Sequence, residues 1–216
     1  MTADARGAAE ARVAQVIGAV ARQALADRGL RRVALLDDGG PEAAFAARVL
    51  AAELGAAAVV RVGVAEGEVE PILHLLGSIP ATRAAEEARR LKARAMDDAL
   101  AAHPANKTAL LLGREIPPEP LLPLGDLYAS DVARLAGRCS APPEVMAIAE
   151  AAGGMEALDA ALGAWIDRRQ PSALDSLPAE AAEAVRRAFA AGRAARSWPR
   201  LVPKLGYRTL GVDLHE

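Results

Sequence analysis

A parallel α/β fold is the class that the sequence predicts. Two short apolar runs, at residues 31–36 and 57–63, flank a helical pattern, which is the strand, helix, strand order from which parallel sheets are built. Beyond residue 129 the apolar side chains recur at helical spacing through most of the chain. With 216 residues, 52% of them hydrophobic, the chain can bury a full core in one unit. We therefore expect a single domain over residues 1–216, a Rossmann-like parallel sheet flanked by helices with a helical C-terminal part.

The first third of the chain alternates clearly between elements. A helix ending near Gly29 is expected from an apolar stripe at three- and four-residue steps, formed by Val13, Val16, Ile17, Val20 and Ala24. The strand at 31–36 then runs into Asp37-Asp38-Gly39-Gly40-Pro41, which breaks regular structure. Pro41 suits the first turn of a second helix, because a missing N–H costs nothing there. Gly55 closes that helix before the strand at 57–63.

The remaining elements are mostly helical. We expect a short helix around residues 72–76, a charged helix from Arg83 to Ala102, a strand at 108–113 and a proline-rich loop from Arg114 to Pro123. The next helix carries a stripe of Tyr128, Val132, Leu135 and Ala136. Asp126 lies where it can cap this helix or complement its dipole. Three more helices follow, around residues 145–152, 158–166 and 185–189, before an extended tail from Trp198.

Composition argues against several classes of function. A formal net charge of -2 with interspersed signs gives no footprint for nucleic acid, and no apolar run approaches the roughly 18 residues of a membrane span. The N-terminus mixes acidic and basic residues before a helical pattern, unlike a signal peptide, so a cytoplasmic protein is expected. Cys139 is the only cysteine, which excludes an internal disulfide. His74, His103 and His215 lack the spacing of metal ligands.

Chemistry is expected at residues 37–43, because parallel sheets bind ligands at the carboxyl ends of their strands. Gly39 and Gly40 let the backbone approach an anion at the N-terminus of the new helix, although a plain tight turn is the commoner reason for such a pair. Asp37, Asp38 and Glu42 oppose a bare polyphosphate, since two like charges about 4 Å apart repel by roughly 4 kcal/mol at an effective dielectric constant near 20. A magnesium ion that bridges carboxylates and phosphates would reverse that repulsion.

A longer motif ties the chain to an enzyme family. Pro123-Leu124-Gly125-Asp126-Leu127-Tyr128 and the helix after it resemble a segment of ammonia-dependent NAD synthetases. In that family the first strand leads into Ser-Gly-Gly-x-Asp-Ser, the pyrophosphate-binding loop of ATP pyrophosphatases, and Asp38-Gly39-Gly40-Pro41-Glu42-Ala43 is similar to it. Both glycines are kept and Glu42 retains a carboxylate at the metal-associated position, whereas both hydroxyl groups are absent.

Other family segments are present in altered form. Leu91-Lys92-Ala93-Arg94-Ala95-Met96 resembles a helix that contributes to the nucleotide site, with Arg94 as its first arginine and Met96 in place of the second. Residues 105–113 resemble the strand that leads to Gly-Thr-Gly-Asn-Lys-Ser-Glu. By that match Arg114-Glu115-Ile116-Pro117-Pro118 replaces the motif, including its metal-binding glutamate. Near the C-terminus Arg196 falls on a family arginine, and Ala195 falls on a lysine that stabilises charge during adenylyl transfer.

The resemblance implies a NAD synthetase-like protein with a degenerate loop, acting as a binding, regulatory or structural homodimer. It implies an adenine nucleotide site with ATP and Mg²⁺ as cofactors, Glu42 as the metal ligand, and a set of nucleotide-binding residues that comprises Asp38, Gly39, Gly40, Glu42, Arg94 and Arg196. Two alternatives stay open. One is an active ammonia-dependent NAD synthase, which converts deamido-NAD, ATP and ammonia into NAD, AMP and pyrophosphate. The other is an ATP-pyrophosphatase relative with a different acceptor.

Overall fold

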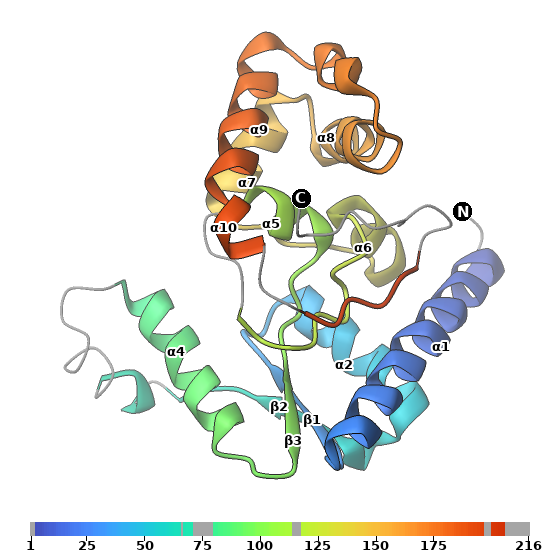
Figure 1. Cartoon of the computed structure of the whole chain (residues 1–216), viewed down its shortest axis with the longest axis vertical. Coiled ribbons are helices and arrows are strands. Elements are labelled where there is room, and N and C mark those ends of the chain that lie inside the picture. The colour runs from blue at the N-terminus through green and yellow to red at the C-terminus, as the bar shows by residue number, and fades with distance from the viewer. Residues whose placement is uncertain (1–2, 66, 71–79, 114–117, 197–199, 206–216) are drawn as a thin grey trace.

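A three-stranded parallel sheet in the order β2-β1-β3 is the centre of the computed structural model, which describes residues 3–65, 67–70, 80–113, 118–196 and 200–205 (Figure 1). β1 (Arg32–Leu36) pairs with β2 (Val59–Val62) on one side and with β3 (Ala99–Ala102) on the other. α1 (Ala3–Arg28) and α2 (Pro41–Leu54) cover one face of the sheet, and α4 (Ala81–Arg94) covers the opposite face. The expected parallel α/β fold is confirmed.

β1 is buried on both faces, and its alternating side chains divide the core. Val33 and Leu35 pack in the cluster that contains α1 and α2, whereas Ala34 and Leu36 pack with Val62 and the α4 side. All four residues of β1 from Val33 onward are at most 2% exposed. A strand covered on both faces has no solvent-facing position, which explains why its sequence is a continuous apolar run.

The chain after β3 builds a second core from helices. α5 (Lys107–Leu112) and α6 (Ala129–Ala136) lead to what we call the helical lobe, which lies above the sheet in Figure 1. The lobe consists of α7 (Pro143–Ala151), α8 (Met155–Leu162), the π-helical turn η2 (Gly163–Asp167), the 3₁₀ turn η3 (Pro171–Ser176), α9 (Ala179–Ala191) and α10 (Arg193–Arg196). Leu111 and Leu112 of α5 are buried in the core of this lobe. The helices expected beyond residue 129 are confirmed.

The expected helix from Arg83 to Ala102 is wrong in its second half, because α4 ends at Arg94 and β3 begins at Ala99. Alanine and leucine prefer helices, so the sequence of β3 gives no sign of a strand. The strand forms because β1 offers it a backbone edge, and the backbone N–H groups of Arg31 and Arg32 both donate to the carbonyl of Asp98 just before it. Tertiary pairing here overrides local propensity.

The expected strand at 108–113 is also wrong, because those residues form α5. Asn106 is the N-cap, and its side-chain oxygen accepts a hydrogen bond of 3.0 Å from the N–H of Ala109. A short apolar run does not by itself distinguish a strand from a buried helix. The expected helix at 72–76 lies outside the described residues, as do Arg114 to Pro117 of the expected loop. Pro118 to Pro123 form no helix, and Leu121 forms isolated bridges with Ala102 and Leu201.

Among the described residues, no helix combines the length and the apolar character that a membrane span requires.

The close packing around Gly125 can be tested by substitution. A methyl group there would lie 3.1 Å from Leu122 Cβ, 3.1 Å from Val202 Cγ1 and 3.2 Å from Leu110 Cδ1. Gly125→Ala is therefore expected to lower the free energy of unfolding by about 1–3 kcal/mol, measured by urea denaturation. Gly7→Ala on α1 is the control, because no atom lies within 4 Å and alanine favours a helix by about 0.5–1 kcal/mol. Equal changes in the two variants would contradict the packing argument.

Candidate functional site

A cavity of about 610 Å³ opens at the carboxyl ends of β1 and β3. β1 is the central strand, with β2 on one side of it and β3 on the other. The connections from β1 and β2 therefore lead to opposite sides of the sheet, and the strand order reverses at β1. Ligands of open α/β sheets bind at such a switch point. The walls come from the turn after β1, the N-terminal half of α4, the turn between β3 and α5, and residues 140–144. The volume is that of a pocket for a small molecule or cofactor.

The turn after β1 uses its own carboxylates to satisfy its backbone. Asp37 Oδ1 accepts a hydrogen bond of 2.9 Å from the N–H of Gly39, and Asp38 Oδ1 accepts one of 2.8 Å from the N–H of Gly40. Gly39 has a φ of 80°, a conformation that favours glycine. Arg61 on β2 binds the second oxygen of Asp37 at 2.6 Å. The glycine N–H groups that a phosphate loop offers to its ligand are therefore already engaged.

Glu42 is 7% exposed and joins α2 to the segment after α6. Its Oε1 accepts hydrogen bonds of 2.6 Å from Cys139 Sγ and from the N–H of Ser140, and its Oε2 accepts one of 2.7 Å from Ser140 Oγ. Burial, followed by the hydrogen bond to Glu42 and its charge, raises the pKa of the Cys139 thiol above its ordinary value. Both oxygens of Glu42 are therefore hydrogen-bonded within the protein, and neither is left free to coordinate a metal ion.

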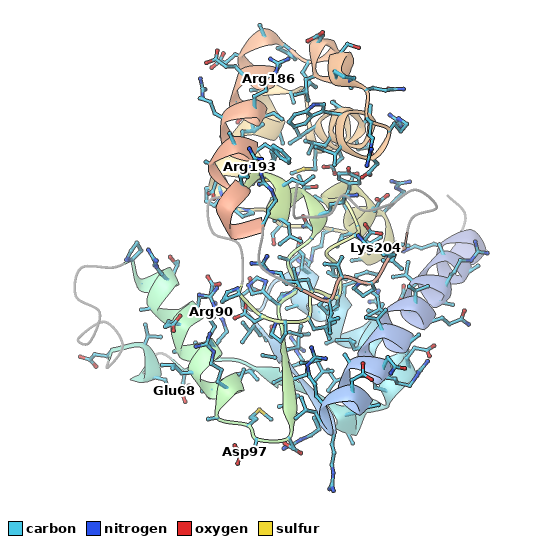
Figure 2. The ribbon with its side chains drawn as sticks, in the orientation of Figure 1. Glu68, Arg90, Asp97, Arg186, Arg193 and Lys204 are labelled. Carbon is cyan, nitrogen blue, oxygen red and sulfur yellow. The ribbon has the colours of Figure 1, made fainter. Side chains whose placement is uncertain are left out.

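Helix α4 presents a polar face to the cavity. Thr82, Glu86 and Arg89 line it at three- and four-residue steps. In the part of the chain that the structure describes, Arg89 forms no ion pair, and its charge acts on Glu86 only at longer range. Arg90, on the same helix (Figure 2), binds the carboxylates of Glu86, Glu87 and Glu119. Arg89 is therefore the cation that this wall offers to a ligand.

The turn between β3 and α5 forms another part of the wall, next to α4. His103 Nε2 lies 3.5 Å from Glu86 Oε1, and His103 Nδ1 accepts a hydrogen bond of 3.1 Å from the N–H of Ala105. The hydrogen bond from His103, followed by the charge of Arg90, holds the pKa of Glu86 below its usual value against the opposing effect of burial. Since both ring nitrogens of His103 are engaged, the histidine shapes the turn and is not a free general base.

A buried charge cluster lies behind this wall, at the start of α5. Lys107 Nζ is 2.6 Å from Asp167 Oδ1 and 3.6 Å from Asp126 Oδ1, and it lies 4.8 Å from the centre of the Tyr128 ring. The Tyr128 hydroxyl donates to Asp167 at 2.9 Å. Burial and the charge of Asp167 raise the pKa of Tyr128 above its usual value. Asp126 also accepts a hydrogen bond of 2.7 Å from the N–H of Leu205.

The N-terminus of α6 is satisfied by residues other than the expected cap. The N–H of Ala129 donates to Thr108 Oγ1 at 2.9 Å, and the N–H of Ser130 donates to Asp159 Oδ2 at 2.7 Å. Thr108 in turn donates to Asp159 Oδ1 at 2.6 Å. The prediction that Asp126 caps this helix is wrong, because its carboxylate faces Lys107 and Leu205. Burial raises the pKa of Asp159 against these hydrogen bonds.

The structure brings Asp38 and Glu42 together in the cavity wall, with Gly39 and Gly40 between them in the chain, but not Arg94 or Arg196. α4 runs antiparallel to the sheet, so Arg94 is exposed near the amino end of β3, where Asp97 also lies (Figure 2). Arg196 is 2% exposed and donates to the carbonyls of Leu111, at 3.0 Å, and Phe189. It stacks on the Phe189 ring, and burial lowers its pKa to about 10. Its surroundings are those of a structural arginine.

Besides Asp38 and Glu42, several polar residues line the cavity that the sequence analysis did not select, among them Arg89, His103, Asn106 and Ser140. The polar face of α4 at helical spacing was a signal for Arg89. His103 was hidden because the strand before it was read as part of a helix.

No group of three or more histidine, cysteine, aspartate or glutamate side chains is placed to hold a metal ion within the residues described. A comparison of the chain with protein-family models finds no matching family, and a comparison with curated proteins finds no match either.

Glu42 provides a test that separates a structural carboxylate from a metal ligand. Glu42→Ala leaves the partly buried donor of Cys139 and the two donors of Ser140 without their acceptor, so we expect a loss of about 1–3 kcal/mol in the free energy of unfolding. Glu150→Ala, at an exposed position of α7, is the control and should change stability little. MgCl₂ should leave the melting temperature of the wild type unchanged. Stabilisation of the wild type by Mg²⁺ that Glu42→Ala abolishes would instead identify a metal ligand.

Proposed function

We propose that this protein is a NAD synthetase-like binding protein, which takes an adenine nucleotide of low charge in the cavity and does not carry out adenylyl transfer. The observation that carries the proposal is that the hydrogen-bonding groups of the turn after β1 are already bound by other groups of the protein. The glycine N–H groups are bound by Asp37 and Asp38, and the Glu42 carboxylate is bound by Cys139 and Ser140. A pyrophosphate would have to displace the two aspartates and would meet their negative charge.

The position of β3 supports a NAD synthetase-like origin. It also changes which residues of this chain correspond to one of the family motifs. In the family a strand leads into Gly-Thr-Gly-Asn-Lys-Ser-Glu, and here β3 leads into His103-Pro104-Ala105-Asn106-Lys107-Thr108-Ala109. Asn106-Lys107-Thr108 keeps the polar centre of that motif. Ala109, which lines the cavity, stands where the family has its metal-binding glutamate. With Glu42 engaged elsewhere, the wall lacks both carboxylates with which the family holds its metal.

The charges on the wall favour a monophosphate over a triphosphate. Arg89 is matched to a single phosphate group, because a guanidinium forms strong charge-assisted hydrogen bonds with phosphate oxygens. Asp38 and Glu144 add negative charge to the wall, and Glu86 is already bound by Arg90. AMP would place its one phosphate near Arg89. Its ribose hydroxyls would then be free to form hydrogen bonds with carboxylates and hydroxyls of the wall. ATP would bring three phosphates, and Arg89 alone would not balance the charge of the additional two.

The proposal includes a homodimer, as the resemblance implies, and the alternative is an active ammonia-dependent NAD synthase. Dimerisation completes the active site in the family that the chain resembles. Light scattering on the purified protein distinguishes a dimer from a 22.3 kDa protomer. The alternative requires Asp38 and Glu42 to release their internal partners and bind magnesium together with the phosphates of ATP.

Turnover decides between the two functions. Purified protein incubated with ATP, Mg²⁺, deamido-NAD and ammonium is expected to form neither pyrophosphate nor NAD above the level of a blank without protein, since the wall lacks the metal carboxylates. An active ammonia-dependent NAD synthetase assayed in parallel shows that the conditions support the reaction. Formation of both products by this protein would establish the alternative and contradict the proposal.

Arg89 and Arg94 form a matched pair for testing the nucleotide site by calorimetry. Arg89→Met is expected to weaken AMP binding at least about tenfold, because a hydrogen bond to a charged group contributes about 1.5–3 kcal/mol. Arg94→Met lies on the same helix but outside the cavity, and it should leave AMP binding unchanged. Equal losses in both variants, or no binding of AMP by the wild type, would contradict the assignment.

A further inference from the structure

A second cavity, of about 330 Å³, lies among α6, α7 and the start of α8. Ala129 and Ala133, one helical turn apart on α6, supply small side chains to its wall. Met146 of α7, Met155 of α8 and Cys139 supply the sulfur atoms. We call this space the methionine cavity. Ser140 lines both this cavity and the larger one, so the two are neighbours.

Sulfur is concentrated here far beyond its share of the chain. The protein has four methionines and one cysteine, and three of these five side chains line the methionine cavity. They lie within residues 139–155, in the segment after α6, in α7 and at the start of α8, and the packing of α7 and α8 beside α6 brings them to one cavity. Met146 is 49% exposed, and apart from Leu91 it is the large apolar side chain that the described structure leaves exposed. An exposed methionine at a concave surface is typical of a binding site that adapts to its ligand.

The chemistry of Cys139 argues against a metal as the occupant. The thiol is protonated, because burial and the neighbouring Glu42 carboxylate raise its pKa, and it donates a hydrogen bond to Glu42 Oε1. Metals bind the thiolate form of cysteine. The three sulfur atoms therefore present a neutral, polarisable surface. Arg134 on the wall is paired with Asp131 at 2.6 Å, and Glu156, the carboxylate on the wall, is exposed to solvent, so the wall charges do not call for an anionic ligand.

We propose that the methionine cavity is a second ligand site, which takes a neutral planar aromatic ring. Thioether sulfurs make favourable contacts with aromatic rings, typically at the ring edge about 5 Å from its centre. The alanines on α6 leave room for the ring, and the volume lies at the small end of the range for ligand pockets, which suits one or two fused rings. The site adjoins the cavity at the carboxyl ends of the strands at Ser140, but its existence does not depend on the function proposed for that cavity.

Methionine methyl NMR tests the site directly. Protein labelled with ¹³C at the methionine methyl groups is titrated with indole, and the signals are assigned with Met146→Leu and Met155→Leu. We expect saturable upfield ring-current shifts of the Met146 and Met155 methyls. Met96, which packs against the sheet, serves as the internal control and should not shift. Cyclohexanol, of similar polarity but without a ring current, should produce smaller shifts at both methyls.

Ala133→Phe is the matched variant, because its side chain would fill the cavity from α6. An unchanged Met96 signal and a cooperative melt establish that the variant is folded, and the indole shifts of Met146 and Met155 should then be lost. If Ala133→Phe does not fold, Ala133→Leu replaces it with the same expectation. Absence of saturable shifts in the wild type, equal shifts of Met96, equal shifts with cyclohexanol, or shifts that persist in the folded filled variant would each overturn the proposal.

Discussion

Lys107 carries a positive charge in the interior, and the connection between the sheet and the helical lobe is organised around it. Its side chain is 6% exposed and lies between Asp126 and Asp167 over the Tyr128 ring. A buried charge is tolerated only when partners replace the water it has lost. Those partners come from the loop before α6 and from the π-helical turn η2, so satisfying one ammonium group fixes three separate segments.

The same cluster gives a structural reason for the segment Pro123 to Tyr128. Gly125 lies where a side chain has no room, Asp126 faces Lys107, and Tyr128 donates to Asp167 while its backbone begins α6. Each of these residues thus contacts other parts of the protein. A segment with this role can persist while the chemistry of the neighbouring cavity changes, which is consistent with the proposed loss of adenylyl transfer.

The hydrogen-bonding groups of the turn after β1 and of Glu42 are satisfied by partners within the protein. Serine at the position of Asp38 would be neutral, whereas the aspartate places a full charge on the N–H of Gly40. Glu42 reaches Cys139 and Ser140 and ties the start of α2 to the segment after α6. The turn thus gains local hydrogen bonds and the cavity gains negative charge, and both effects lower the affinity for polyphosphate.

Sequence patterns identified some elements and failed at others for identifiable reasons. β1 and α2 were predictable because a doubly buried strand is continuously apolar and Pro41 with Gly55 marks the helix ends. β3 was missed because its four residues, alanines and one leucine, favour a helix until β1 supplies a partner. α5 was read as a strand from its apolar run, although the cap residue Asn106 preceded it. Asp38 and Glu42 were placed in the cavity by the strand-end rule, whereas Arg94 and Arg196 were chosen by motif alone and lie elsewhere.

The sequence by itself determined the parallel α/β class, the helical character of the C-terminal part and the position of the candidate site after β1, because these depend on local periodicity and turn residues. Only the tertiary structure decided which polar groups face the cavity and which are used inside the protein. Arg89 and Arg94 are five residues apart on one helix, yet one lines the cavity and the other is exposed beyond it. That difference arises from the direction in which α4 crosses the sheet, a property of the packing of distant segments that no local pattern records.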